Sequence, residues 1–199
     1  MDINEACRII EGVRGGAILV ATMGAMGAFD QLGAAQPRIN SVPLMGGAAS
    51  IGLGLAIGRP DRRVIVVDGD ASLLMQLGGL ATVAERQPRN FHHFVIRNGT
   101  QFSGFSNLAT PAEDIVDFAA MAKAAGYRGA SSFSDAAAFS EALPAILAED
   151  GPIFTELRVT PPPPIPGANT QFEIPPQQFV RMGAEAVALS AWLAERGND

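Results

Sequence analysis

Apolar positions along the chain follow two spacings, one typical of helices and one typical of buried strands. Short apolar runs predict strands at 17–21, 64–67, 91–96 and 153–159. Helical spacing predicts helices at 3–13, about 22–31, 47–57, 73–84, 110–125, 134–149 and 176–195. Because strands that alternate with helices are typical of parallel crossovers, we expect an α/β fold: a doubly wound, mostly parallel sheet with helices on both faces.

Local signals indicate where several helices begin or end. The sequence TPAE at 110–113 has the N-cap, first-turn proline and glutamate of a capping box, so a helix is expected to begin there and to stop at Gly126. Pro144 is expected to kink or shorten its helix. Residues 1–160 are expected to form one domain. Residues 161–199 are expected to form a proline-rich spacer and a C-terminal helix, packed on the domain or on a partner.

Composition and charge exclude several classes of protein. With 199 residues, 48% of them hydrophobic, the chain can bury a core, which excludes a disordered or fibrous protein. Lys and Arg number 14 against 20 Asp and Glu, giving a net charge of −6. Since the basic residues form no cluster, we expect neither a nucleic-acid nor an anionic membrane partner.

The single cysteine and the N-terminal sequence bear on the compartment. Cys7 can form no intrachain disulfide, and one thiol is too few for an iron–sulfur cluster or a structural zinc site. The first residues lack the pattern of a signal peptide, so a cytoplasmic location is expected. Residues 39–58 carry no charge, but Pro43 and several glycines interrupt them. We therefore expect a loop and a buried small-residue helix there rather than a membrane span.

Polar residues and glycines follow three of the predicted strands. Thr22-Met23-Gly24, Asp70-Ala71-Ser72 and Asn98-Gly99-Thr100 all fall at carboxyl ends of strands, where doubly wound sheets bind ligands. Asp70 and Asn98 lie one helix and one strand apart, which brings both to one edge of a parallel sheet. Their oxygen atoms suit a hard divalent cation, and glycine-rich backbone near a helix start suits a diphosphate.

Two common nucleotide-binding motifs are absent from the sequence. No Gly-Lys-Ser/Thr occurs, which excludes a Walker loop. The Gly52-x-Gly54 pair precedes a strand and is followed by Ile57 where the dinucleotide fingerprint needs a third glycine. A Rossmann dehydrogenase is therefore disfavoured.

The segment VVDGDASLLMQLGGLATVAERQPRNFHHFVIRNG, residues 66–99, resembles the signature of thiamine diphosphate enzymes. The segment MGGAASIGLGLAIGRPDRRVIVVDGD, residues 45–70, is similar to the same region of sulfopyruvate decarboxylase beta subunits and phosphonopyruvate decarboxylases. The resemblance extends more weakly over most of residues 1–160. It implies the diphosphate-binding domain of a 2-oxo acid decarboxylase, with thiamine diphosphate and Mg²⁺ as cofactors.

The resemblance also implies which residues bind the cofactors. Asp70, the Asn98 side chain and the backbone carbonyl of Thr100 would bind Mg²⁺. Met45 would hold the cofactor in its bent conformation, and the carbonyl of Pro43 would accept a hydrogen bond from the aminopyrimidine. The residues expected near the diphosphate are Thr22, Gly24, Gly69, Ala71 and Ser72.

Three residues depart from the family pattern. Ala71 replaces the second glycine of the signature, Arg97 replaces the first asparagine of its closing pair, and Pro43 stands where relatives often have glycine. Ala71 and Arg97 leave open a second class of function, a non-catalytic α/β binding module that keeps only the fold and its partner contacts.

The length of the chain implies a partner. Enzymes of this family use a second domain that supplies the activating glutamate, and residues 1–160 leave no room for one. The resemblance therefore implies a beta subunit in a hetero-oligomer with paired copies, completed by a separate alpha subunit that carries the pyrimidine-binding domain. The implied reaction releases CO2 and an aldehyde from a small anionic 2-oxo acid, and an acetolactate synthase-like carboligase remains an alternative. Ser103 and Ser106, just after the metal turn, are candidate donors to the substrate.

Overall fold

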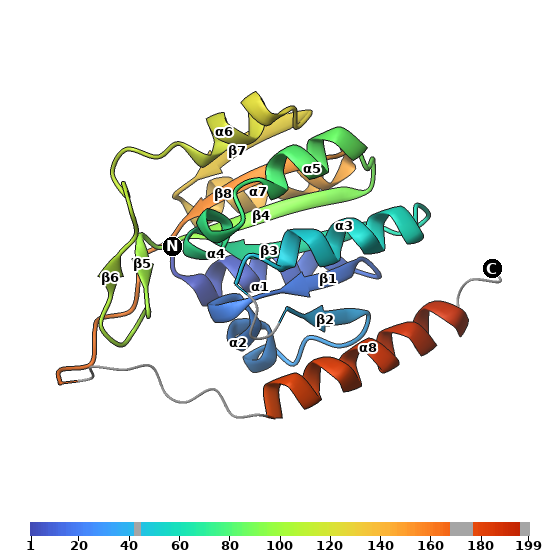
Figure 1. The fold of residues 1–199 in the computed structure, drawn as a ribbon, viewed down its shortest axis with the longest axis horizontal. Coiled ribbons are helices and arrows are strands. Elements are labelled where there is room, and N and C mark those ends of the chain that lie inside the picture. The colour runs from blue at the N-terminus through green and yellow to red at the C-terminus, as the bar shows by residue number, and fades with distance from the viewer. Residues whose placement is uncertain (42–44, 168–176, 196–199) are drawn as a thin grey trace.

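The computed structural model describes residues 1–41, 45–167 and 177–195. Six parallel strands form one sheet in the order β2-β1-β3-β4-β8-β7 (Figure 1). The strands are β1 (Ile18–Ala21), β2 (Arg38–Asn40), β3 (Val64–Gly69), β4 (Phe91–Arg97), β7 (Gly129–Phe133) and β8 (Ile153–Arg158). A small antiparallel hairpin, β5 (Thr100–Gln101) and β6 (Leu108–Ala109), follows β4.

Helices cover both faces of the sheet. Those described are α1 (Ile3–Arg14), α2 (Met23–Gln31), α3 (Ala48–Gly58), α4 (Asp70–Met75), α5 (Gly79–Arg86), α6 (Phe118–Ala125), α7 (Ala136–Ala148) and α8 (Gln177–Glu195). Strand β3 shows how the layers form, because all four of its valine and isoleucine side chains are fully buried. Ile65 and Val67 pack with α1, α2 and α7, whereas Val64 and Val66 pack with α3, α5 and α6. The doubly wound α/β prediction is confirmed.

The small-residue helix α3 packs closely on the sheet. A Cβ on Gly52 would lie 2.3 Å from Cγ2 of Val66. Helix α3 can therefore lie this close to β3 only because residue 52 has no side chain. This agrees with the interpretation of residues 47–57 as a buried helix. In the parts of the chain that the structure describes, no helix has the length and apolar character that crossing a membrane requires.

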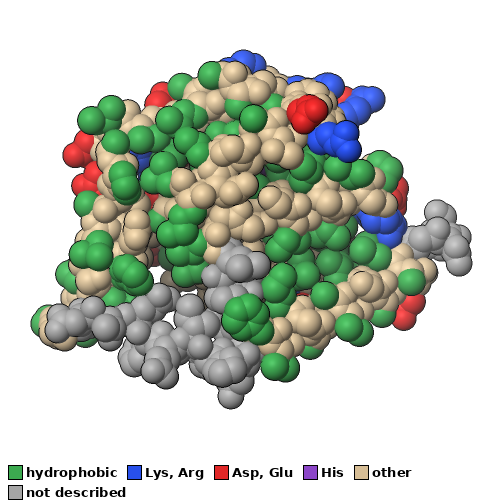
Figure 2. All heavy atoms as spheres, in the orientation of Figure 1, with side chains coloured by type: hydrophobic (Ala, Val, Ile, Leu, Met, Phe, Trp, Pro, Cys, Tyr) green, Lys and Arg blue, Asp and Glu red, His purple; other side chains and the backbone are tan. Residues whose placement is uncertain are grey.

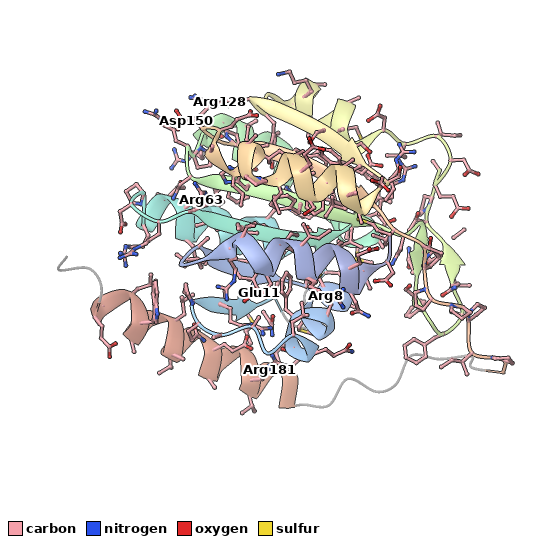
Figure 3. The ribbon with its side chains drawn as sticks, turned by 180° about the vertical axis from the view of Figure 1, so that it is seen from behind. Arg8, Glu11, Arg63, Arg128, Asp150 and Arg181 are labelled. Atoms are coloured by element: carbon pink, nitrogen blue, oxygen red, sulfur yellow. The ribbon has the colours of Figure 1, made fainter. Side chains whose placement is uncertain are left out.

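Helix α8 runs along the edge strand β2 (Figure 1). Arg181, labelled in Figure 3, donates to the carboxylate of Asp30 on α2 at 2.6 Å, and Glu185 accepts from the backbone and side-chain nitrogens of Asn40 at 2.7 and 3.0 Å. Hydrophobic side chains lie along α8 in Figure 2, and Val180 and Val187 are largely exposed. The helix therefore directs two of its charged side chains inwards and covers an edge that would otherwise offer unpaired backbone groups.

The capping-box prediction at 110–113 was wrong. Residues 111–115 form turns, and α6 begins at Phe118 with Asp117 as its N-cap, where Oδ1 accepts from the backbone N–H of Ala120. The reason is tertiary: the backbone N–H of Thr110 donates to the carbonyl of Gly99 at 2.9 Å, which ties this segment to the β5–β6 hairpin.

Other predicted boundaries also changed. The predicted helix 73–84 is two helices, α4 and α5, because Gln76 leaves the helical conformation and glycines follow it. Strands β2 and β7 were not predicted, since RIN and GASSF lack an apolar run. Helix α7 continues through Pro144. His92 and His93 point to opposite faces of β4, as alternate residues of a strand do, and neither lines the cavity described below.

Candidate cofactor site at the strand ends

A cavity of about 420 Å³ lies at the carboxyl ends of the central strands. Residues that follow β1, β3 and β4 line it, and β1 and β3 are the neighbours at which the strand order changes direction. Such a switch point is where doubly wound folds bind their ligands. Of the residues predicted to contact the cofactors, Thr22, Gly24, Met45, Gly69, Asp70, Ala71, Ser72, Asn98 and Thr100 line the cavity. Pro43 lies outside the described residues.

Asp70 is the first residue of α4 and is buried. Its carboxylate accepts hydrogen bonds from the backbone N–H of Ala71 at 2.8 Å and of Gly99 at 2.7 Å. Burial raises the pKa of Asp70, and the backbone hydrogen bonds from Gly99, Ala71 and Asn98 oppose that shift. The residue therefore joins the ends of β3 and β4 and places a desolvated negative charge in the cavity, which a cation would stabilise.

Asn98 and Thr100 face this carboxylate from the turn after β4. Oδ1 of Asn98 accepts from the backbone N–H of Thr100 at 2.9 Å and from its hydroxyl at 3.3 Å. These contacts fix the orientation of the amide, with its oxygen on the same turn as the Thr100 carbonyl. Gly99 between them has φ +69°, a conformation that favours glycine.

These groups form a suitable donor set for Mg²⁺. The three predicted ligands are one carboxylate, one amide oxygen and one backbone carbonyl, and Mg²⁺ prefers oxygen ligands while keeping positions for water and phosphate. Among the described residues, no group of three His, Cys, Asp or Glu side chains is placed to hold a metal ion. Three protein ligands would leave coordination positions for water and for phosphate oxygens, as Mg²⁺ sites commonly do.

Ser72 positions the loop that carries Met45. Its hydroxyl accepts a hydrogen bond from the backbone N–H of Gly46 at 2.8 Å. Gly46 has φ +84°, and a Cβ there would lie 2.8 Å from Cβ of Gln76. Only glycine fits both conditions, so α4 and this glycine together hold Met45 at the cavity wall.

Thr22 and Gly24 lie at the start of α2. The hydroxyl of Thr22 donates to the carbonyl of Ser41 at 3.1 Å, which joins the ends of β1 and β2. Met23 follows with φ +50°, and a Cβ on Gly24 would lie 3.0 Å from the Ile3 side chain. These contacts constrain the backbone of this turn beside the cavity. The Thr22 hydroxyl is already used in a hydrogen bond within the protein.

The structure accounts for the two departures from the signature that fall within the described residues. Ala71 lies in the first turn of α4 without a positive φ, so alanine causes no backbone strain there. Arg97 does not line the cavity. Its guanidinium pairs with Glu156 at 2.8 Å, and Asn98 and Thr100 remain in place. Neither residue removes a predicted metal ligand.

The hairpin tip and the segment after β8 form the outer wall of the cavity. Phe102, Ser103, Phe105, Pro161 and Pro162 are among the lining residues, and Oγ of Ser103 is buried without a hydrogen-bond partner. Ser103, a candidate donor to the substrate, therefore lies at the cavity. Ser106 does not line the cavity.

The proline segment was expected to be a spacer, and its role in this wall was missed. Asn107 donates from Nδ2 to the carbonyl of Pro162 at 2.8 Å, and the backbone N–H of Ile165 donates to the carbonyl of Phe105 at 3.1 Å. Asn107 Oδ1 also accepts from the N–H of Gly104. These contacts join segments about 55 residues apart in sequence, and no local pattern signals them.

Comparison with known proteins gives the site its context. The model of the family "Thiamine pyrophosphate enzyme, C-terminal TPP binding domain" matches residues 22–157. The chain belongs to this family. The matched region contains Asp70, Asn98 and Thr100. The predictions of the family and of thiamine diphosphate as its cofactor are confirmed, with Mg²⁺ the usual metal of such domains.

Two relatives and one solved structure illustrate the likeness. A phosphonopyruvate decarboxylase of Streptomyces viridochromogenes is 44% identical over 122 residues, which cover 60% of this chain and 30% of that protein. A sulfopyruvate decarboxylase subunit beta of Methanothermobacter thermautotrophicus is 41% identical over 117 residues, 59% of either chain. The chain thus spans less than two thirds of these relatives. The thiamine diphosphate-dependent 4-hydroxybenzoylformate decarboxylase of Rhodococcus jostii RHA1 shares the fold, with TM-score 0.66, 22% identity and coverage of 80% of this chain and 33% of that one.

Proposed function

We propose that this chain is the diphosphate- and metal-binding subunit of a thiamine diphosphate-dependent 2-oxo acid decarboxylase, with sulfopyruvate and phosphonopyruvate as first candidate substrates. The observation that carries the proposal is the meeting of Asp70, Asn98 and Thr100 in one cavity at the strand ends. The relatives named as decarboxylases, and the one named as a beta subunit, support the reaction class.

In this proposal each part of the cavity has a task. Thiamine diphosphate, when bound, supplies the electron sink that allows a 2-oxo acid to lose CO2. Asp70, the Asn98 amide and the Thr100 carbonyl would hold Mg²⁺, and the backbone of Gly69, Ala71 and Ser72 at the start of α4 would bind the diphosphate. Met45 would support the cofactor rings. The outer wall of aromatic and proline side chains excludes water, and Ser103 donates to the substrate.

The groups missing from the described lining point to a partner. The lining residues that the structure describes include two charged side chains, Asp68 and Asp70, and no Glu, Lys, Arg or His. An activating glutamate and a cation for the anionic tail of the substrate would therefore come from outside these lining residues. We therefore propose a separate alpha subunit as that partner, in keeping with the relatives named subunit beta.

A carboligase of the acetolactate synthase type remains the alternative reaction, because the same metal and diphosphate groups would serve it. The non-catalytic alternative has lost its two supports, since neither Ala71 nor Arg97 removes a predicted ligand.

The test is to purify the native complex with Mg²⁺ and record its mass under non-denaturing conditions. A second chain and bound thiamine diphosphate are expected, together with CO2 release from sulfopyruvate, phosphonopyruvate or pyruvate. Product analysis separates an aldehyde from a carboligation product. A chain that associates only with itself and retains no cofactor would contradict the proposal.

A further inference from the structure

Arg97 stands next to the predicted metal ligand Asn98 but directs its side chain away from the cavity. The guanidinium pairs with Glu156 through Nη1 at 2.8 Å, donates through Nη2 to the carbonyl of Glu113, and lies over the ring of Phe118 at 5.6 Å. Glu156 is fully buried, and the Arg97 side chain is only 11% exposed. Arg97 is therefore held in one orientation by three different groups.

The contact with Glu113 joins the two ends of the segment that contains the predicted metal ligands Asn98 and Thr100. Residues 98–112 leave β4, form the β5–β6 hairpin and return, and Arg97 connects the two ends of this excursion. At the returning end, the backbone N–H of Thr110 donates to the carbonyl of Gly99 at 2.9 Å. The Glu113 carboxylate lies 3.1 Å from where a Cβ on Gly99 would be, so it packs directly on this glycine.

Gly99 is consequently held from two sides. Its N–H donates to Asp70 at 2.7 Å on the cavity side, and Thr110 and Glu113 hold it on the other. Because Gly99 lies between Asn98 and Thr100, its position sets the spacing of the amide and carbonyl oxygens relative to the Asp70 carboxylate. Metal affinity depends on this spacing, since Mg²⁺ demands near-ideal octahedral geometry.

We propose that Arg97 is a positioning residue for the metal site, which holds the 110–113 segment against Gly99 and thereby fixes Asn98 and Thr100 relative to Asp70. This inference rests on the proposed function, and it gives a purpose to the residue that departs from the signature. Lysine cannot replace arginine here, because one ammonium lacks the planar fork that reaches Glu156 and Glu113 together and stacks on Phe118.

The test measures metal affinity directly in the complete complex saturated with thiamine diphosphate. Equilibrium dialysis with Mg²⁺ and electron paramagnetic resonance of Mn²⁺ in the same site give the dissociation constants and the symmetry of the metal environment. Arg97→Lys is expected to weaken binding about 10- to 100-fold, the usual cost of losing a group that orients metal ligands. Arg158→Lys is the matched control, since Arg158 also bonds Oε1 of Glu156 at 2.8 Å but is 53% exposed; a change within about twofold is expected.

Arg97→Asn, which restores the residue typical of the signature, separates this role from its alternatives. The proposal expects weaker binding, because asparagine cannot reach Glu113. Equal or tighter metal binding by Arg97→Asn would overturn it, as would a lowered melting temperature of Arg97→Lys with an unchanged metal dissociation constant. If the Arg97 variants fail to fold, Glu156→Gln serves instead, because it weakens the ion pair that orients Arg97. This variant must still lower metal affinity. A wild-type complex that binds neither metal nor cofactor refutes the proposed function itself, whereas normal wild-type binding with unaffected variants refutes only the role of Arg97.

Discussion

Replacing Asp70 by asparagine removes the charge of the predicted metal ligand while keeping the size of the side chain. The carboxylate has a second role, because it accepts from the N–H groups of Ala71 and Gly99. A smaller substitution such as Asp70→Ala would leave both donors without an acceptor. At about 1–3 kcal/mol for each buried unsatisfied group, alanine is expected to cost about 2–6 kcal/mol of folding free energy. Asparagine keeps one acceptor and avoids part of this loss.

The loss of metal binding is expected to exceed the loss of stability. Removing a group that merely orients a metal ligand costs about 10- to 100-fold in affinity, so removing the charged ligand itself is expected to cost at least about 100-fold. Burial raises the pKa of Asp70, so the carboxylate is costly to keep charged in the metal-free protein. Asp70→Asn relieves this cost, which offsets part of the hydrogen bond it loses, so its metal-free stability is expected to be closer to that of the wild type than that of Asp70→Ala.

Two measurements separate the effects. Denaturant unfolding without metal reports the folding free energy, and equilibrium dialysis of the complex reports Mg²⁺-dependent retention of thiamine diphosphate. Asp68→Asn is the matched control: Asp68 is also buried and lines the same cavity, but it is not a predicted ligand. It is expected to change metal affinity by less than about 10-fold. Wild-type retention by Asp70→Asn, or equal losses in both variants, would refute the assignment of Asp70 as the metal ligand.

Three further predictions follow from single side chains. Gly52→Ala is expected to destabilise the fold by about 1–3 kcal/mol, because the new Cβ would lie 2.3 Å from Val66, while Gly54→Ala, with nothing within 4 Å, is the stable control; thermal unfolding distinguishes them. Burial, with a smaller contribution from Arg63, lowers the pKa of His92 to about 4. Because that value lies below the ordinary 6.5, the neutral His92 side chain stabilises the fold above pH 6.5. About 3 kcal/mol of the free energy of unfolding is lost as the pH falls from 6.5 towards 4. Urea unfolding of His92→Gln should lack this pH dependence. Ser103→Ala is expected to raise the substrate KM about 3- to 10-fold and Ser106→Ala to leave it unchanged, and equal effects would exclude Ser103 as the substrate donor.

The sequence predicted the layers of the fold because burial on both faces produces a strong local pattern. The run Val64–Val67 has no polar residue, and each of its side chains is fully buried. Strand β7, GASSF, lies at the edge of the sheet with most of its residues half-buried, so its small and polar residues satisfy the strand without an apolar run. Pairing with β8 decides its conformation, and single-sequence patterns carry no signal of that pairing.

The placement of Asp70 and Asn98 in one cavity was predictable for the same physical reason. Asp70 and Asn98 each follow a buried strand directly, and parallel neighbours bring their carboxyl ends to one edge. The outer wall was less accessible to prediction, because the proline segment reaches it through hydrogen bonds between Asn107 and Pro162 and between Ile165 and Phe105. The capping-box error at 110–113 has a related cause, since the contact of Thr110 with Gly99 outweighs the local preference for a helix.

The charge of the cavity leads to a constraint on any partner. Its described lining carries two buried carboxylates, Asp68 and Asp70, and the nearby cation Arg97 is committed to Glu156 and Glu113. A divalent metal compensates for Asp70 and for part of a diphosphate, which leaves no positive group of this lining for an anionic substrate. Burying an unpaired anion is costly. We therefore expect a chain that completes this site for an anionic 2-oxo acid to supply basic side chains to the cavity, and a partner surface without them would favour a substrate with an uncharged tail.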